Sequence, residues 1–182
     1  MNLDFKKLIK WSNENYSHLP WREKRSLYGT WISEVMLQQT TVYTVKSRLD
    51  IFLKKFPSVK SLSMASDDEL LVAWKGLGYY QRAKNLKKAA LKITNEFKGK
   101  FPSSLDELTE IPGIGPYTSS AIYSIGMNKK SLAVDSNLER VLGRYYGIET
   151  PKGPKLKTEI TNLFNESKIL SEKNISSWRE LN

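Results

Sequence analysis

Hydrophobic residues recur along most of the chain at spacings of three and four, which is the repeat of an amphipathic helix. The longest example runs over residues 79–97 and predicts one helix with a buried stripe. That stripe consists of Ala83, Leu86, Ala90, Ile93 and Phe97. The rest of this helix carries basic side chains, so we expect an exposed, positively charged outer surface. Its basic residues are Arg82, Lys84, Lys87, Lys88 and Lys92.

Two helix starts are marked by capping boxes, in which a serine hydroxyl and a carboxylate three residues later satisfy free amides of the first turn. They pair Ser66 with Glu69 and Ser104 with Glu107. No segment shows the alternation of apolar and polar residues that is typical of a strand. The sequence therefore predicts an all-α fold of about nine or ten short helices, because proline and glycine interrupt the chain often.

The segment WISEVMLQQTT, residues 31–41, raises a question about Glu34. A helical step of about 100° per residue gives this helix a core face and an opposite face. The core face holds Tyr28, Ile32, Val35 and Met36, and the opposite face holds Glu34, Leu37, Gln38 and Thr41. Periodicity alone makes Glu34 a solvated surface residue. The apolar and amide neighbours on its face instead indicate a ligand, and the helix pattern leaves both interpretations open.

The composition narrows the choice of ligand. The chain has 182 residues, 40% of them hydrophobic and 26% charged, which suits a soluble globular protein of one compact unit or two small lobes. A formal net charge of +10 favours a polyanionic partner. Because this charge is spread along the chain, nucleic acid fits better than a membrane surface. A basic protein without an anionic partner is the alternative.

Several classes of protein are excluded by what the sequence lacks. The N-terminal residues MNLDFKKLIKW include an acid and lysines, so they do not form a secretory signal. No run reaches the ~18 apolar residues of a membrane span. The chain has no cysteine, which excludes a disulfide framework, a thiolate metal site and an iron–sulfur cluster bound by this chain. We expect a cytosolic protein, associated with the nucleoid if its source is a bacterium.

The strongest local motif is LTEIPGIGPYTSSAI, residues 108–122. One helix ends at Ile111 and Pro112, the two glycines allow a tight turn with positive φ, and a new helix begins near Tyr117 and Thr118. The free amides of such a turn, at a helix N-terminus, bind phosphate oxygens. We interpret the motif as a hairpin that places Gly113, Gly115 and Thr118 at a DNA backbone. A plain linker between two helices is the alternative.

Asp135 follows the hairpin, in the segment LAVDSNLERVLGR (132–144). It can cap the helix that carries Leu138, Val141 and Leu142, which is an ordinary structural role for aspartate. A helix N-terminus also keeps an aspartate ionised, ready to face a developing positive charge. We therefore treat Asp135 as a candidate catalytic carboxylate as well as a cap.

The motifs follow one another in the order of a known family. They are LPWR (19–22), SEVMLQQT (33–40), GLGYY (76–80), IPGIGPYTSSAI (111–122) and VDSN (134–137). From about residue 5 to its C-terminus, the chain resembles the adenine DNA glycosylase (MutY) family of the helix-hairpin-helix DNA glycosylase superfamily. The resemblance implies a two-lobed all-α fold with the active site in the cleft between the lobes.

The resemblance assigns chemistry to four residues. Glu34 matches the glutamate that protonates adenine, and Asp135 matches the aspartate that stabilises the oxocarbenium-like sugar or bonds to it transiently. Two carboxylates in different environments suit glycosidic cleavage in general. Tyr117 stands where lyase-competent relatives such as endonuclease III carry a lysine that forms a Schiff base, so strand cleavage by that route is not expected. Asn137 matches a residue that supports Asp135.

Other residues match positions that handle the substrate, since the target adenine must leave the base stack. Gln39 and Tyr79 match residues that enter the duplex at the lesion, although packing in the core is the ordinary role of a tyrosine. Leu37, with Gln38 beside it, matches a contact to the mispair. The residues that match the border of the adenine pocket are Trp21 and Arg22.

The resemblance also predicts how the chain divides. Residues 19–134, with the hairpin at 108–122, form a helical barrel domain, and residues 1–18 plus 135–182 form a second lobe. Family members continue into a four-cysteine iron–sulfur loop and a domain that recognises 8-oxoguanine, and this chain stops before both. We expect no cofactor in this chain other than a monovalent cation at the hairpin. The chain is either part of a longer protein or a clusterless form.

The implied function is hydrolytic removal of adenine mispaired with 8-oxoguanine or guanine, by a monofunctional glycosylase of base excision repair. The expected partner is double-stranded DNA, with no membrane, no obligate protein partner and a monomeric state. A sister glycosylase that removes thymine from guanine:thymine mispairs is one alternative, although Glu34 within SEVMLQQT argues against it. A DNA-binding remnant without catalysis is the other, and the presence of both carboxylates argues against that.

Overall fold

The computed structural model describes residues 5–166 and 177–181, and every regular element in those residues is helical. The elements are α1 (Phe5–Tyr16), α2 (Pro20–Glu23), α3 (Leu27–Leu37), α4 (Val42–Lys55), α5 (Val59–Ser63), α6 (Asp67–Ala73), α7 (Gln81–Glu96), α8 (Leu105–Thr109), α9 (Pro116–Ala121), the π-helix η1 (Ile122–Gly126), α10 (Ser136–Tyr145), α11 (Pro154–Asn165) and α12 (Trp178–Leu181). The all-α prediction is confirmed. The described residues contain more helices than the nine or ten predicted, because several helices are too short to show a periodic pattern.

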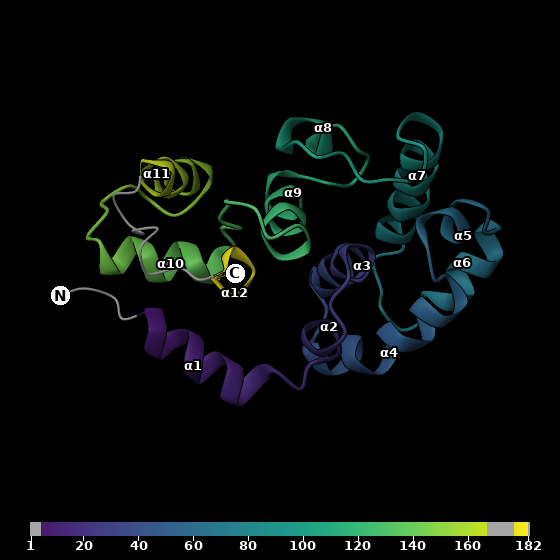
Figure 1. Ribbon diagram of the computed structural model, residues 1–182, viewed down its shortest axis with the longest axis horizontal. Helices are drawn as coiled ribbons and strands as arrows, with labels where there is room; N and C mark the ends of the chain where they lie inside the picture. The colour runs from purple at the N-terminus through teal and green to yellow at the C-terminus, as the bar shows by residue number, and fades with distance from the viewer. Residues whose placement is uncertain (1–4, 167–176, 182) are drawn as a thin grey trace.

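Two hydrophobic cores hold these helices together. The larger core lies among α3 to α9 and η1, and the smaller one lies between α10 and α11. In Figure 1, α1, α10, α11 and α12 gather at one end of the molecule, α4 to α7 lie at the other end, and α9 stands between them. The smaller core begins at Leu132, slightly before the predicted boundary at residue 135. The division into two domains at that boundary stays a prediction.

Helix α3 is the central helix of the larger core. All residues from Gly29 to Met36 are buried, because α3 contacts α2, α4, α7, α9 and η1 around its circumference. The prediction of a solvated face for Glu34 is therefore wrong, since its side chain is only 8% exposed. Periodicity identifies one core face only when the opposite face meets water, and here it meets other helices. Glu34 is thus a buried acid.

The predicted helix starts are found, with one difference in detail. Ser66 and Glu69 form the complete capping box at the start of α6. Ser104 caps α8 by accepting from the amide of Glu107 at 3.3 Å, but its hydroxyl donates to the Glu107 carboxylate at 2.7 Å. The Glu107 carboxylate therefore binds the serine hydroxyl and not the backbone amide that a complete capping box requires.

Helix α7 matches the predicted long helix and buries the stripe around Ala83, Leu86 and Ile93. Lys84 and Lys88 are exposed as predicted. Arg82 is the exception, because its guanidinium points inward and bonds to backbone oxygens of α3 and of two loops. The prediction that Arg82 belongs to the basic outer surface is wrong. Arg82 lies at the edge of the buried stripe of α7, and its side chain is long enough for the guanidinium to turn towards the interior.

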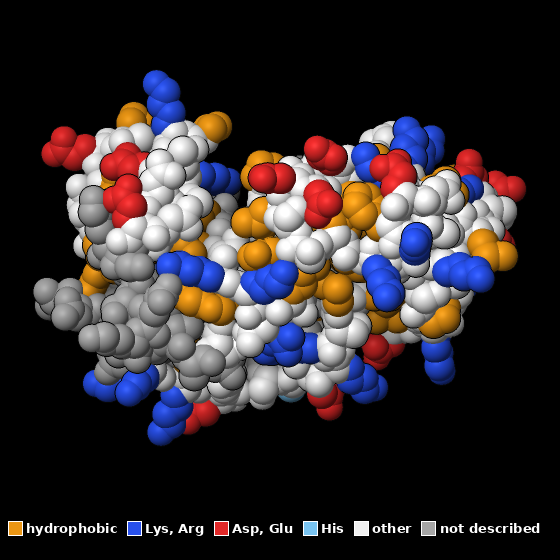
Figure 2. Space-filling model, turned by 45° about the horizontal axis from the view of Figure 1, so that its top comes forward, with side chains coloured by type: hydrophobic (Ala, Val, Ile, Leu, Met, Phe, Trp, Pro, Cys, Tyr) orange, Lys and Arg blue, Asp and Glu red, His pale blue; other side chains and the backbone are white. Residues whose placement is uncertain are grey.

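Positive charge is spread over the surface of the molecule. Figure 2 shows lysine and arginine side chains across the full width of the viewed face, with several acidic side chains along its upper edge. Within the described residues, no helix combines the length and the apolar character needed to cross a membrane. The cytosolic location stays a prediction.

Candidate active site

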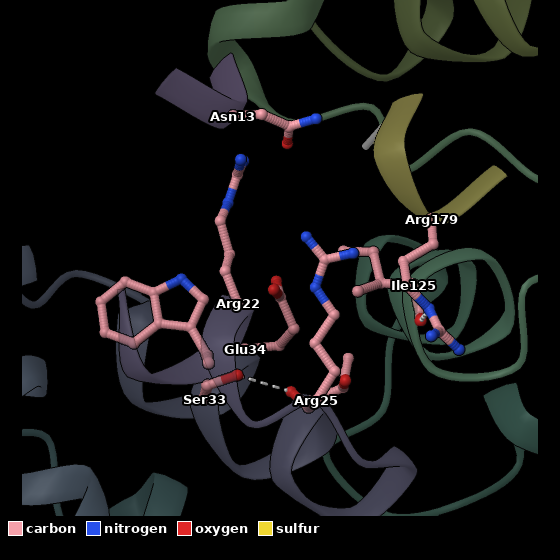
Figure 3. A pocket seen from close by; sticks show the side chains of 9 residues that line it. Asn13, Arg22, Arg25, Ser33, Glu34, Ile125 and Arg179 are labelled. Atoms are coloured by element: carbon pink, nitrogen blue, oxygen red, sulfur yellow. Dashed lines mark hydrogen bonds between the residues drawn. The ribbon is translucent and has the colours of Figure 1, made fainter. Parts of the chain in front are cut away.

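A pocket of about 160 Å³ opens beside Glu34. Helices from both ends of the chain line this pocket (Figure 3). They are α1, α2 and α3 from the N-terminal part, and η1 and α12 from the C-terminal part. The lining residues are Asn13, Trp21, Arg22, Arg25, Thr30, Ser33, Glu34, Ile125 and Arg179. In Figure 3 the Glu34 side chain stands between those of Arg22 and Arg25. The pocket therefore surrounds one buried acid with cationic side chains.

The Glu34 carboxyl group has one partner on a distant helix. The hydroxyl of Tyr117, at the start of α9, donates to Glu34 Oε2 at 2.9 Å. Burial raises the pKa of Glu34 above its ordinary value, and the negative charge of Asp135 raises it further, while the Tyr117 hydrogen bond and the Arg22 charge lower it. Burial is the largest of these effects. Glu34 thus binds a proton more tightly than an exposed glutamate.

Asp135 caps helix α10, as the sequence predicts. One carboxylate oxygen accepts from the amides of Asn137 at 3.0 Å and Leu138 at 2.7 Å. The side-chain amide of Asn137 donates to the other oxygen at 3.1 Å. The electrostatic effect of Asp135 on both Glu34 and Tyr117 shows that the cap lies near the buried acid. Tyr117 therefore contacts Glu34 directly, and Asp135, bound by Asn137, is close enough for its charge to act on both. Tyr117, Asp135 and Asn137 lie outside the lining of the pocket beside Glu34.

The hairpin between α8 and α9 has the predicted turn but only one glycine in the left-handed region. Gly113 has φ +77°, whereas Gly115 has φ −86° and ψ −179°, which any residue adopts. The prediction of positive φ for both glycines is wrong at Gly115. A β-carbon at Gly113 would lie 2.7 Å from the β-carbon of Asn85 in α7. Close approach to α7 therefore requires glycine at position 113.

Two residues predicted to contact DNA bond to each other. Gln38 Nε2, just after α3, donates to Thr118 Oγ1 in α9 at 3.3 Å. Thr118 is only 3% exposed, so its hydroxyl faces the protein interior. This bond holds the end of α3 against the hairpin. Gly113 and Gly115 remain exposed at the turn.

Three more of the predicted DNA-contacting residues lie outside the pocket lining. Gln39 and Tyr79 are exposed, and both have positive φ, at +56° and +46°. Leu37 is half-buried and packs against the larger core. Tyr79 has two interpretations, packing in the core and entry into the duplex at the lesion. Packing in the core is the weaker one, since the Tyr79 side chain is 63% exposed. Gln39 and Tyr79 are thus both exposed and both outside the lining of the Glu34 pocket.

Sequence reasoning missed six residues of the pocket: Asn13, Arg25, Thr30, Ser33, Ile125 and Arg179. The basic segment PWREKR could have marked Arg25 together with Arg22, although α2 ends at Glu23 and leaves Arg25 outside the helix. Arg179 has no such local signal. It reaches the pocket because its guanidinium donates to the backbone oxygens of Ile125 at 2.7 Å and Gly126 at 3.3 Å in η1.

No group of three or more histidine, aspartate or glutamate side chains within the described part of the chain is arranged to hold a metal ion. The monovalent cation at the hairpin stays a prediction. The chemistry available from the residues described here is that of a buried acid, a capped carboxylate and a tyrosine hydroxyl.

Comparison with known proteins agrees with this arrangement. Residues 32–166 match the family model described as HhH-GPD superfamily base excision DNA repair protein. The chain belongs to the HhH-GPD superfamily. The matched region contains Glu34, Tyr117, Asp135 and Asn137, whereas Arg179 lies beyond it.

Two curated relatives of this HhH-GPD protein are named adenine DNA glycosylase. Adenine DNA glycosylase of Buchnera aphidicola subsp. Baizongia pistaciae is 48% identical over 130 residues, which are 71% of this chain and 37% of that protein. Adenine DNA glycosylase of Homo sapiens is 38% identical over 150 residues, covering 78% of this chain and 28% of that protein. The chain spans less than half the length of these curated relatives.

Solved structures share the HhH-GPD fold. A thermostable thymine-DNA glycosylase superposes with a TM-score of 0.83 at 28% identity, over 97% of this chain and 80% of that one. A non-covalent endonuclease III–DNA complex superposes with a TM-score of 0.73 at 21% identity, over 98% of this chain and 82% of that one. The helix-hairpin-helix fold class predicted from the sequence is confirmed.

Gly113→Ala should lower the free energy of unfolding by about 1–3 kcal/mol, because alanine meets both a left-handed backbone and the side chain of Asn85. Gly115→Ala is the matched control, since no atom lies within 4 Å of an added β-carbon there. The control should change stability by less than about 0.5 kcal/mol. Urea denaturation measures both variants. Equal destabilisation by the two substitutions would contradict this account of the turn.

Glu34→Gln should make the protein more stable at neutral pH and leave its stability unchanged in acid. The folded state raises the pKa of Glu34, so it holds a proton that the unfolded chain releases above about pH 4.5. Wild-type stability should therefore fall, relative to the variant, as pH rises from that value. Thermal unfolding of both proteins between pH 4 and pH 8 tests this. A difference in stability that is constant with pH would refute the assignment.

Proposed function

We propose that this protein is a monofunctional DNA glycosylase that hydrolyses the N-glycosidic bond of adenine mispaired with 8-oxoguanine or guanine. The observation that carries the proposal is the buried Glu34 carboxyl group, hydrogen-bonded to Tyr117 and close enough to Asp135 for their charges to interact. The adenine DNA glycosylases that match most of this chain support the choice of base.

Glu34 acts as the general acid in this proposal. Adenine leaves more readily when a ring nitrogen has been protonated, and a carboxyl group with a raised pKa keeps its proton to a higher pH than an exposed carboxyl group does. Burial supplies that raised pKa. The Tyr117 hydroxyl keeps Glu34 Oε2 in one orientation, so that the other carboxyl oxygen can face the base.

Asp135 stabilises the sugar as positive charge develops on it. Two backbone amides and the Asn137 side chain fix this carboxylate at the start of α10. A fixed negative charge close to an oxocarbenium-like centre lowers the barrier without rearrangement during the reaction. A water molecule then completes hydrolysis at the sugar. The two carboxyl groups therefore have different roles because their surroundings differ.

The substrate in this proposal is duplex DNA. The net charge of +10 and the spread of lysine and arginine side chains in Figure 2 favour a polyanion. The exposed hairpin at Gly113 and Gly115 supplies backbone amides for phosphate oxygens. Gln39 and Tyr79, exposed and outside the pocket, would enter the duplex where the adenine has left the stack.

Incubation of the protein with duplexes that contain 8-oxoguanine:adenine, guanine:adenine or guanine:thymine, followed by alkali, reveals abasic sites. We expect adenine release from the first two duplexes. In Glu34→Gln the rate of adenine release should fall by at least about a thousandfold, as expected when a general acid is removed. Lys88→Ala, an exposed change on α7, is the matched control and should retain activity. Thymine release, or DNA binding without release of any base, would defeat the proposal in favour of the two alternative functions.

The same reactions without alkali should show no strand nicking. Tyr117 occupies the position at which the lysine of a Schiff-base lyase would stand, and its hydroxyl is engaged by Glu34. Tyr117→Lys supplies the missing amine and serves as the comparison. Treatment with borohydride should trap a covalent complex only in that variant. A trapped complex in the wild-type protein would contradict the assignment of Tyr117.

A further inference from the structure

The guanidinium group of Arg82 joins the end of the central helix to the loop that follows it. Nη1 donates to the backbone oxygens of Val35 at 2.8 Å, Met36 at 2.9 Å and Gln38 at 2.5 Å. The carbonyl groups in the last turn of a helix lack partners within the helix. Arg82, from α7, therefore supplies the hydrogen bonds that end α3 and fixes the backbone just before Gln39.

The other nitrogen of the same group reaches a second loop. Nη2 donates to Leu77 O at 2.7 Å and Gly78 O at 3.2 Å, and also to Thr40 Oγ1 at 2.9 Å. The Thr40 hydroxyl lies 3.3 Å from Leu77 O and donates to it as well. One guanidinium group thus bonds to the segment 38–40 and to the segment 77–78 at the same time.

An exposed residue in the left-handed region lies within the first of these segments and directly after the second. Gln39 lies between Gln38 and Thr40, and Tyr79 directly follows Gly78. For residues other than glycine such a backbone is strained and persists only where its surroundings impose it. The Arg82 guanidinium carbon also lies 5.6 Å from the centre of the Tyr79 ring, at the distance of a cation–π contact. Arg82 is therefore the shared support of both strained positions.

We infer that Arg82 is a positioning residue that couples Gln39 and Tyr79 into one rigid probe of the DNA mispair. The inference rests on the proposed function for the part played by DNA. The two loops approach the duplex at a fixed separation, because the same side chain holds both backbones. Recognition of the mispair then depends on Arg82, whereas cleavage at Glu34 does not, since Arg82 does not line the Glu34 pocket.

Arg82→Lys is the informative substitution. Lysine keeps the positive charge but offers a single ammonium group, which cannot span both sets of acceptors as the planar guanidinium does. We expect the Kd for an 8-oxoguanine:adenine duplex to rise about tenfold, a typical coupling between neighbouring groups. The rate of adenine release at saturating protein should stay within about threefold of wild type. Lys88→Ala, which removes an exposed charge from the same helix, should change neither quantity.

A double-mutant cycle tests the coupling itself. Gln39→Gly and Tyr79→Gly remove the side chains while allowing the left-handed backbone. Their effects on duplex binding should be non-additive when Arg82 is present and additive in the Arg82→Lys background. Non-additivity that survives in Arg82→Lys would overturn the inference, as would a Kd unchanged by that substitution. If Arg82→Lys does not fold, Thr40→Val removes one shared partner and should reduce the non-additivity.

Hydrogen exchange of the DNA-free protein distinguishes failure of the inference from failure of the proposed function. Arg82→Lys should speed amide exchange in segments 38–41 and 77–80 together. Faster exchange in only one segment would overturn the coupling even in an active enzyme. If the wild-type protein releases no adenine, the proposed function fails, and joint acceleration of exchange still supports Arg82 as the support of both loops.

Discussion

An ionisable carboxyl group inside a helical core is costly unless a donor meets it, and the donor for Glu34 is the hydroxyl of Tyr117. These residues are far apart in the sequence, so their bond requires α9 to lie against α3. That contact in turn requires the tight turn at Gly113 and its close approach to α7. The hairpin geometry thus supplies the hydrogen-bond donor for Glu34, and the burial of Glu34 raises its pKa.

Local rules predict a large part of this structure from the sequence. The caps at Ser66 and Asp135 depend on residues within a few positions, and the buried stripe of α7 depends on a single repeat. The motifs of the family resemblance predicted that Glu34, Tyr117, Asp135 and Asn137 share one site. The structure places Tyr117 against Glu34 and Asn137 against Asp135, while the catalytic roles of these residues stay a prediction. Such features need no knowledge of how distant helices pack.

Features that depend on distant contacts could not be predicted in this way. Glu34 appeared solvated because periodicity cannot show how many helices surround α3. Arg82 appeared to be a surface charge because its acceptors are carbonyl groups, which every residue possesses and no sequence pattern marks. Arg179 acts through the same kind of acceptor in η1. The positions of Arg82 and Arg179 could therefore not be predicted, because both side chains bind backbone oxygens.

Arg179 lies in α12, which is the last element of the pocket lining to be synthesised. The ribosome delivers the buried acid, the hairpin and the capped carboxylate well before it delivers α12. Until then the carbonyl groups of Ile125 and Gly126 lack their guanidinium partner and the pocket lacks one of its cationic sides. A nascent chain therefore carries Glu34, Tyr117 and Asp135 before the pocket beside Glu34 is complete.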